Sequence, residues 1–267
     1  KAVEAPTKFK TLSDLDPLIE LYHHTVRAGQ YDEAQKLFKD RIDTPTYYQF
    51  GAYQLQIELL RSLFPDGEDK PPRSKSEDAQ GWVVSTLANS YSLNGEPRKA
   101  APLFEQDIAI CEKLGDKKNL GIDLGAVASA AYLPIGTLRS AEANTRRSIE
   151  LCREISDEFR EAIGHRELGR VLAYRGEWDE AEKELTTALE MFEKQNYPHG
   201  QGVFWTYQSL KMLLMLRTAM TNIPEFSPTD ILTAVNHALD FANEWARTRY
   251  PIEREFVRAH WLLGAAH

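Results

Sequence analysis

The hydrophobic pattern is clearest between Glu158 and Asn196, where it predicts two helices joined by a tight turn at Arg175–Glu177. The apolar residues of the second helix recur at steps of three and four, as on one buried helix face: Trp178, Ala181, Leu185, Ala188 and Leu189. Small residues at Gly169, Ala181 and Ala188 mark positions where two helix backbones can approach closely. The stretch therefore predicts a packed helical hairpin.

The same hairpin pattern recurs along the chain. An apolar or small residue followed by a small one appears at Ala88, Ala128, Gly169 and Ser209, at spacings of 40, 41 and 40 residues. Helical hairpins with this pattern, in units of ~34 residues, are typical of tetratricopeptide (TPR) repeats, whose neighbours stack to bury a common core. We therefore predict an all-α fold, a right-handed superhelix of TPR-like hairpins with about 12 helices in about 40-residue repeats. The first helix of each hairpin would line a concave groove.

The domain boundaries follow from the same pattern. Residues 1–13 are polar and predict a linker, and residues 14–267 predict a single superhelical domain. Thr46–Phe64 reads as one long helix, followed by a loop at 65–78 that is rich in Pro, Gly and charge. Such a loop is either a solvated surface connection or a ligand or partner loop. Leu263-Gly264 begins a first helix without a partner, so we expect a fragment of a longer chain.

Repeat equivalence also interprets three residues that carry possible chemistry. Cys111 and Cys152 each lie eleven residues after an alanine of the close-packed face, which predicts core packing. Asp107 falls on the same face, so its carboxylate is either turned outward or paired with a buried base. None of the three suggests a redox site.

Composition limits the function further. The chain has 32 basic and 40 acidic residues, a net charge of −8, and no dense basic run. This argues against a nucleic-acid partner, because phosphate binding needs a concentrated positive face. No apolar run reaches the ~18–20 residues of a membrane span, and two cysteines make no disulfide framework. We expect a cytoplasmic protein with no membrane partner.

The sequence offers little chemistry. It has no glycine-rich phosphate loop, no paired-cysteine motif and no nucleophile elbow. The adjacent His23 and His24 point about 100° apart on a helix, so they are poorly placed to chelate one metal. We expect no catalytic residues, no metal site and no cofactor.

Candidate binding residues come from the groove-facing positions of the repeat frame. In the copy at Leu120–Ile155 these are Ile122, Gly125, Ser129 and Tyr132, and in the repeat at Glu158–Asn196 they are Ile163, Arg166, Arg170 and Ala173. The predicted ligand-binding residues are Trp82, Asn89, Tyr132, Arg166, Arg170, Tyr174 and Trp205. Arg166 and Arg170 would either clamp a carboxylate or phosphate or pair with Glu167, Asp123 or Asp157. The aromatic residues would either wall a ligand or pack between helices.

Three stretches resemble a known family: LIELYHHTVRAGQYDEAQKLFKDRI, YYQFGAYQLQIELLRSLFPDGEDKPPR and RRSIELCREISDEFREAIGHRELGRVLAYRGEWDEAE. They are similar to the TPR-like sensor region of bacterial signal-transduction ATPases of the STAND class (NB-ARC type). The resemblance implies a sensor that responds to an inducer and regulates the protein's own upstream nucleotide-binding module. No ATPase motif lies in these 267 residues, so nucleotide binding does not carry over.

Three functional hypotheses remain. The leading one is a non-enzymatic superhelix that senses a small-molecule inducer and regulates an attached STAND ATPase. The alternative is a protein–protein interaction scaffold that grips a peptide or partner helix in its groove. A third is self-association through the uncovered terminal face. Unpaired Arg166 and Arg170 in a closed pocket would favour a small anion, and an open groove would favour a peptide.

Overall fold

The protein is described by a computed structural model that covers residues 9–218, 227–248 and 252–266. All regular elements in these ranges are helices, which confirms the predicted all-α fold of repeated hairpins. None of the described helices is long and apolar enough to cross a membrane. The chain divides into two compact units, Lys1–Asp116 (unit 1) and Lys117–His267 (unit 2). That residues 14–267 form a single domain stays a prediction.

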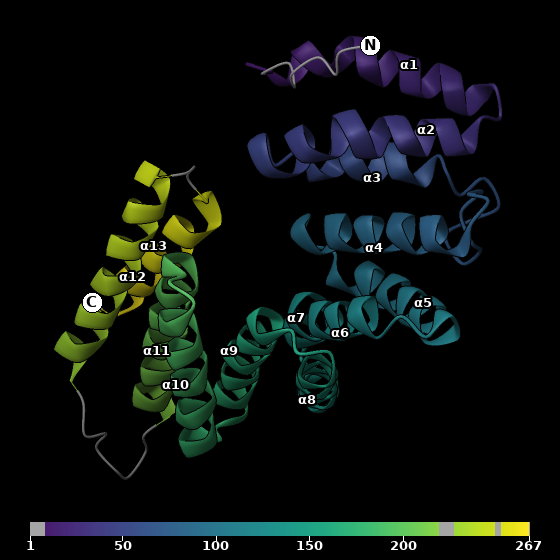
Figure 1. The fold of residues 1–267 in the computed structure, drawn as a ribbon. Helices are drawn as coiled ribbons and strands as arrows, with labels where there is room; N and C mark the ends of the chain where they lie inside the picture. The colour runs from purple at the N-terminus through teal and green to yellow at the C-terminus, as the bar shows by residue number, and fades with distance from the viewer. Residues whose placement is uncertain (1–8, 219–226, 249–251, 267) are drawn as a thin grey trace. The chain divides into compact units, whose positions relative to one another are not determined.

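Unit 1 is a stack of hairpins (Figure 1). Its elements are η1 (Leu12–Leu15), α1 (Asp16–Arg27), α2 (Tyr31–Leu37), η2 (Phe38–Ile42), η3 (Pro45–Gln49), α3 (Tyr53–Arg61), α4 (Glu77–Leu93) and α5 (Pro97–Leu114). The 3-10 turn η1 falls partly in the segment predicted as a linker. The hairpin turns at Gly29 and Gly95 lie where the repeat frame expects them, with φ of +73° and +82°. A Cβ at either glycine would meet nothing within 4 Å, so the left-handed backbone, not crowding, requires glycine there.

The prediction of one helix over Thr46–Phe64 is wrong. The helical path from Tyr31 runs on through η2 and η3, and it breaks at Phe50–Ala52 before α3 begins. Gly51 adopts φ of +59°, which a right-handed helix does not contain. The pattern misled because Phe50-Gly51 resembles the Leu168-Gly169 pair, although Gly51 serves a turn and Gly169 a helix contact.

We call the segment after α3, residues 62–76, the strap, because hydrogen bonds and buried residues hold it against the rest of unit 1. Ser74 is buried, and its hydroxyl donates to the side-chain oxygen of Gln35 at 2.7 Å, while the Gln35 amide donates to the carbonyl of Ala79 at 2.9 Å. Leu63 and Phe64 are also buried at the start of the segment. Part of this connection is therefore buried in the core of unit 1.

Of the two remaining core predictions in unit 1, the structure agrees with the one for Cys111 and differs for Asp107. Cys111 is buried and forms no disulfide, in agreement with its predicted packing role. Asp107 is buried as well, so the expectation that it turns outward is wrong. Its Oδ1 lies only 2.7 Å from where a Cβ at Gly81 would stand. The glycine on α4 thus leaves room for a carboxylate on α5.

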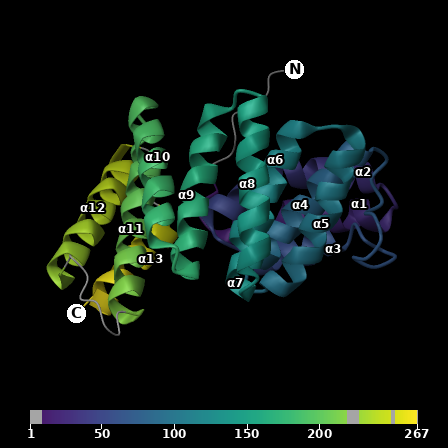
Figure 2. The ribbon, with the colours of Figure 1, turned by 90° about the horizontal axis from the view of Figure 1, so that it is seen from below.

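Unit 2 contains the most regular hairpins. Its elements are α6 (Lys117–Ala126), η4 (Val127–Tyr132), α7 (Leu133–Ile135), α8 (Leu138–Glu154), α9 (Glu158–Arg175), α10 (Trp178–Lys194), α11 (Pro198–Thr218), α12 (Pro228–Thr248) and α13 (Glu253–Ala266). Figure 2 shows α8, α9, α10 and α12 following one another across the unit. First helices are α6, α9, α11 and α13, and second helices are α8, α10 and α12.

Close approach of α9 and α10 occurs where the small residues predict it. A Cβ at Gly169 would stand 2.6 Å from Leu185 Cγ and 3.1 Å from the carbonyl oxygen of Ala181. Real Cβ atoms do not come so near, so the two backbones require glycine at this point. Leu168, Leu172 and Ala181 are buried in the same cluster. Cys152 is buried and free, as predicted.

Candidate functional site

A cleft of about 200 Å³ lies in unit 2 between the first helices α6 and α9, with α8 behind it. Its lining combines small residues, hydroxyls, two isoleucines and three charged side chains: Gly121, Gly125, Ala126, Gly164, Ser129, Thr145, Ser148, Ile122, Ile163, Arg160, Arg166 and Glu167. Five of these positions belong to the groove-facing set of the repeat frame. The repeat frame thus accounts for five of the residues that line the cleft, and binding at this surface stays a prediction.

The second helix α8 sets the width of the cleft. Ser148 on α8 donates a hydrogen bond to the carbonyl of Gly121 on α6 at 2.5 Å. On the other side, a Cβ at Gly164 of α9 would lie 2.6 Å from Ile149 Cγ1 of α8. Both first helices thus pack tightly on α8. Gly121, Gly125 and Gly164 permit this packing, because a Cβ at each would lie against α8.

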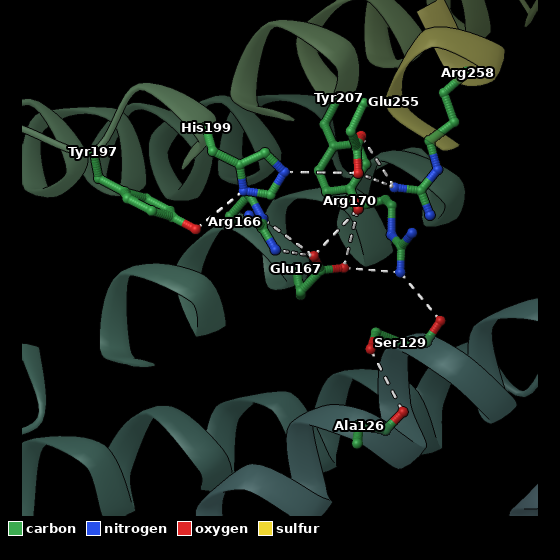
Figure 3. Close-up of polar contacts among 10 residues, drawn as sticks. All are labelled: Ala126, Ser129, Arg166, Glu167, Arg170, Tyr197, His199, Tyr207, Glu255 and Arg258. Atoms are coloured by element: carbon green, nitrogen blue, oxygen red, sulfur yellow. Dashed lines mark hydrogen bonds and ion pairs between the residues drawn. The ribbon is translucent and has the colours of Figure 1, made fainter. Parts of the chain in front are cut away.

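Glu167 stands at the edge of this cleft and at the centre of a charged group that we call the arginine cluster: Arg166, Glu167, Arg170, Tyr207, Glu255 and Arg258 (Figure 3). Arg166 Nη2 and Arg170 Nη2 each lie 2.8 Å from a Glu167 carboxylate oxygen, and the Tyr207 hydroxyl donates to the same carboxylate at 3.2 Å. Of the two alternatives for the arginine pair, the structure shows the pairing with Glu167.

Burial and charge together set the protonation of this group. Burial by itself raises the pKa of Glu167, but the guanidinium groups of Arg170 and Arg166 outweigh it and lower that pKa below its usual range. Burial raises the pKa of Tyr207, and the Glu167 charge adds to the rise. The ring of Tyr207 lies 4.9 Å from Arg170 Cζ, a cation–π distance. Glu167 is thus an ionised, fully engaged carboxylate.

Arg170 also joins α9 to the neighbouring repeat. Its Nη2 donates to the backbone carbonyl of Ser129 at 3.1 Å. That carbonyl lacks a helical donor, because the N–H of Leu133 donates to Ala128 in the π turn η4 and the following Pro134 has no N–H. A guanidinium from the next first helix supplies the missing hydrogen bond.

The π turn explains the one irregular repeat spacing. The hairpin turn Gly136 lies eight residues after Ala128, whereas Gly95 and Gly176 lie seven after Ala88 and Gly169. The sequence suggests that the turn itself takes up the extra residue, but it is accommodated earlier, in η4 (Val127–Tyr132). Single-turn π segments are the usual way for a helix to hold one inserted residue.

A polar chain extends from the cluster on α11. The hydroxyl of Tyr197 lies 3.1 Å from His199 Nδ1, and His199 Nε2 lies 3.9 Å from Glu255 Oε1. His199 Nε2 is buried and has no hydrogen-bond partner among the described residues. Within either unit by itself, the described residues bring no three His, Cys, Asp or Glu ligand atoms into metal-binding range.

The predicted binding residues do not form one site in either unit. In unit 1, the ring centroids of Trp82 and Phe38 lie 6.2 Å apart. The side-chain amide of Asn89 donates to the carbonyl of Ser85 in its own helix. In unit 2, Tyr132 packs against the buried residues Ala128, Ala141 and Val171. The ring centroids of Trp205 and His237 lie 4.7 Å apart.

These contacts are the interhelix packing that the sequence left as the alternative for the aromatics. Tyr174 differs, with 46% of its surface exposed. Of the predicted residues, Arg166 lines the cleft, and Arg166 and Arg170 both belong to the arginine cluster. Ligand binding by any of the seven stays a prediction.

Sequence reasoning missed Tyr207, Glu255 and Arg258 as partners of the arginine pair. A signal for Tyr207 was present, because Glu167 and Tyr207 are 40 residues apart and so hold the same repeat position on adjacent first helices. The groove positions considered were three and six before the small residue and one and four after it. Glu167 and Tyr207 lie two before it. Arg258 also had a signal, because it lies six residues before Gly264, the small residue of the last signature pair, whereas Glu255 had none.

The chain is similar to solved structures at low sequence identity. Two solved structures of a Podospora anserina putative kinesin light chain with nearly identical TPR-like repeats are each 16% identical to the chain. One of them, a form with a single substitution, covers 91% of this chain and 99% of its own at a TM-score of 0.48, and the other covers 90% and 99% at 0.46. BtubC (BKLC) from P. vanneervenii is 15% identical, covers 95% of this chain and 85% of its own, and has a TM-score of 0.38.

Sequence comparisons give a narrower result. No curated protein sequence is significantly similar to this chain. One family model matches, over a stretch that begins within α4, includes α5 and ends at the start of α6. Residues 85–118 match the tetratricopeptide repeat.

Proposed function

We propose that this chain is a non-enzymatic binding scaffold, and that the cleft between α6 and α9 receives a side chain of an extended peptide from a protein partner. The observation that carries the proposal is the cleft itself, with its small and hydroxyl-bearing lining. Stacked helical repeats generally use the face of their first helices to bind proteins or peptides. They carry no chemistry of their own.

The size of the cleft favours a peptide side chain over a larger ligand. Pockets for small molecules usually enclose roughly 300–1,000 Å³, and this cleft encloses about 200 Å³. Ile122 and Ile163 offer apolar contact, and Ser129 and Ser148 offer polar groups. Such a lining suits a medium-sized side chain, with the rest of the peptide passing over the first helices.

The state of Arg166 and Arg170 supports the same choice. Both arginines pair with Glu167, so an incoming small anion would have to displace a carboxylate that is already held by two guanidinium groups. We therefore favour the scaffold over the sensor of a small-molecule inducer. Regulation of an upstream ATPase module rests on the resemblance and stays a prediction.

The test is selection of binders from a random-peptide library with the full chain immobilised, followed by affinity measurement on variants. Ala126 lines the cleft at the end of α6, so Ala126→Phe fills it. Ala143 is exposed on the second helix α8, so Ala143→Phe is the matched control. We expect Ala126→Phe to abolish binding and Ala143→Phe to retain it. Equal binding by both variants, or no selected peptide, contradicts the proposal.

A further inference from the structure

The arginine cluster carries more positive than negative charge. Arg166, Arg170 and Arg258 contribute three positive charges, and Glu167 and Glu255 contribute two negative ones, so 3 − 2 leaves +1. This local excess contrasts with the chain as a whole, which has a net charge of −8. A partly buried cluster with one unmatched guanidinium is a place where an anion lowers the electrostatic energy.

Arg258 holds the unmatched charge. Its Nη1 lies 3.4 Å from both oxygens of Glu255, a long and one-sided contact. In the described part of the chain its Nε and Nη2 have no hydrogen-bond partner, and the side chain is 41% exposed. By contrast, Arg166 and Arg170 are each 13% exposed and paired at 2.8 Å. Arg258 therefore keeps one edge of its guanidinium open.

Arg258 lies near the groups that organise the cluster. The charge of Arg258 acts on both Glu167 and Tyr207. Arg170 contributes a second cation there, and its Nε is buried without a hydrogen-bond partner among the described residues. Figure 3 shows the Arg170 side chain between Ser129, which lines the cleft, and Arg258. A peptide crossing α9 from the cleft toward α13 would pass from one to the other.

We infer that Arg258, assisted by Arg170, binds the carboxylate of an aspartate or glutamate side chain in the peptide that occupies the cleft. This inference rests on the proposed function. A carboxylate matches the open guanidinium edge by two parallel N–H···O contacts, the geometry that makes arginine selective for this group. It brings the cluster to neutrality and supplies the partners that Glu255 does not provide.

The first experiment needs no selected peptide. Phenylglyoxal modifies the accessible arginines of the full chain, and mass spectrometry follows Arg258 and Arg139, an exposed arginine on α8. The probes are an acetylated Ala-Glu-Ala-Glu-Ala amide, its Gln counterpart and inorganic phosphate. We expect the Glu peptide to slow modification of Arg258 several-fold and to leave Arg139 unchanged, with the other two probes less effective. Equal protection by the Gln peptide, stronger protection by phosphate, or no protection overturns the inference.

The second experiment uses the peptides selected with the full chain. These should be enriched in Asp or Glu, and Arg258→Gln should weaken their binding about tenfold or more, as for loss of a charged hydrogen bond. Arg139→Gln, with the same change in charge, should leave the affinity unchanged, and thermal unfolding checks that both variants are folded. Equal affinity of the two variants overturns the inference. If Ala126→Phe no longer binds the selected peptides but the Glu peptide still protects its Arg258 from phenylglyoxal, the effect of the cleft is distinguished from that of the carboxylate site.

Discussion

At the scale of single residues, Glu167 shows how a buried charge is retained. Its side chain is 10% exposed, yet it accepts from two guanidinium groups and a tyrosine hydroxyl. Removing one partner of a buried ion pair is more costly than never having the pair, because the remaining charge stays buried without compensation. Removing the Glu167 charge would leave the charges of Arg166 and Arg170 buried without their partner.

We therefore predict that Glu167→Gln lowers the free energy of unfolding by about 3 kcal/mol at neutral pH. Glu150→Gln, at an exposed position of α8, removes the same charge and should have an effect of less than about 0.5 kcal/mol. Urea unfolding followed by circular dichroism measures both. Similar losses in the two variants would mean that Glu167 has no special role.

The same residue predicts a pH dependence. The pKa of Glu167 is lowered in the folded protein, so its contribution is fully present above the unfolded value of about 4.3 and is lost as pH falls through the folded value. The difference in unfolding free energy between wild type and Glu167→Gln should thus shrink as the pH is lowered below about 4.3. A difference independent of pH across an acid series contradicts this assignment.

At the scale of elements, the π turn η4 ties an insertion to a contact between repeats. The inserted residue shifts the N–H of Leu133 to Ala128, Pro134 cannot replace it, and Arg170 then bonds the free carbonyl of Ser129. The extra residue is visible in the spacing, but its location depends on which backbone hydrogen bonds form. The hairpin turn needs a residue with positive φ, and Gly136 provides it with φ of +82°. The extra residue is therefore accommodated in the helix before the turn.

A double-mutant cycle tests this connection. Pro134→Ala restores an N–H that can donate to the Ser129 carbonyl, so Arg170→Met should cost less stability in that background than in the wild type. We expect a coupling of about 1 kcal/mol, the size of one buried hydrogen bond. Chemical denaturation of the four proteins gives the value. Strict additivity would show that Arg170 acts only through Glu167.

The strap after α3 gives a second prediction at this scale. Gln35 holds Ser74 and the carbonyl of Ala79, so Gln35→Ala should release the strap. Trypsin should then cleave after Arg73 several-fold faster, because proteolysis requires a segment that opens locally. Gln54→Ala, on an exposed position of α3, is the control and should leave the rate unchanged. Equal rates in both variants contradict a strapped connection.

At the scale of the whole molecule, the chain comprises two compact units, each with its own buried residues. In repeat proteins stability is approximately a sum over repeats and their nearest-neighbour interfaces. Unit 2 contains the arginine cluster and three helix pairs with glycine-mediated contacts, α8–α9, α9–α10 and α11–α12. These interactions are all internal to the unit.

We predict that residues 117–267, produced alone, fold cooperatively. Circular dichroism should show a helical spectrum and a single thermal transition. Glu167→Gln should shift this transition by as much as it shifts the corresponding one in the full chain, because its partners are all retained. A fragment without a cooperative transition would show that unit 2 depends on residues 1–116.

The sequence by itself determined the helical hairpins, their spacing and the close-packed small residues. These features follow from local periodicity and from backbone conformations that only glycine readily adopts, as at Gly176 with φ of +79°. Five of the residues that line the cleft also follow from the repeat frame, because equivalent residues in a repeat point the same way.

Only the tertiary structure decided the rest. Gly51 and Gly169 follow similar residues, yet one makes a turn and the other a helix contact, since their neighbours in space differ. The partners of Arg166 and Arg170, and the open edge of Arg258, depend on how α9, α11 and α13 pack. Charge pairing acts through distance in space, and residues 167, 207 and 258 become neighbours only after the repeats stack.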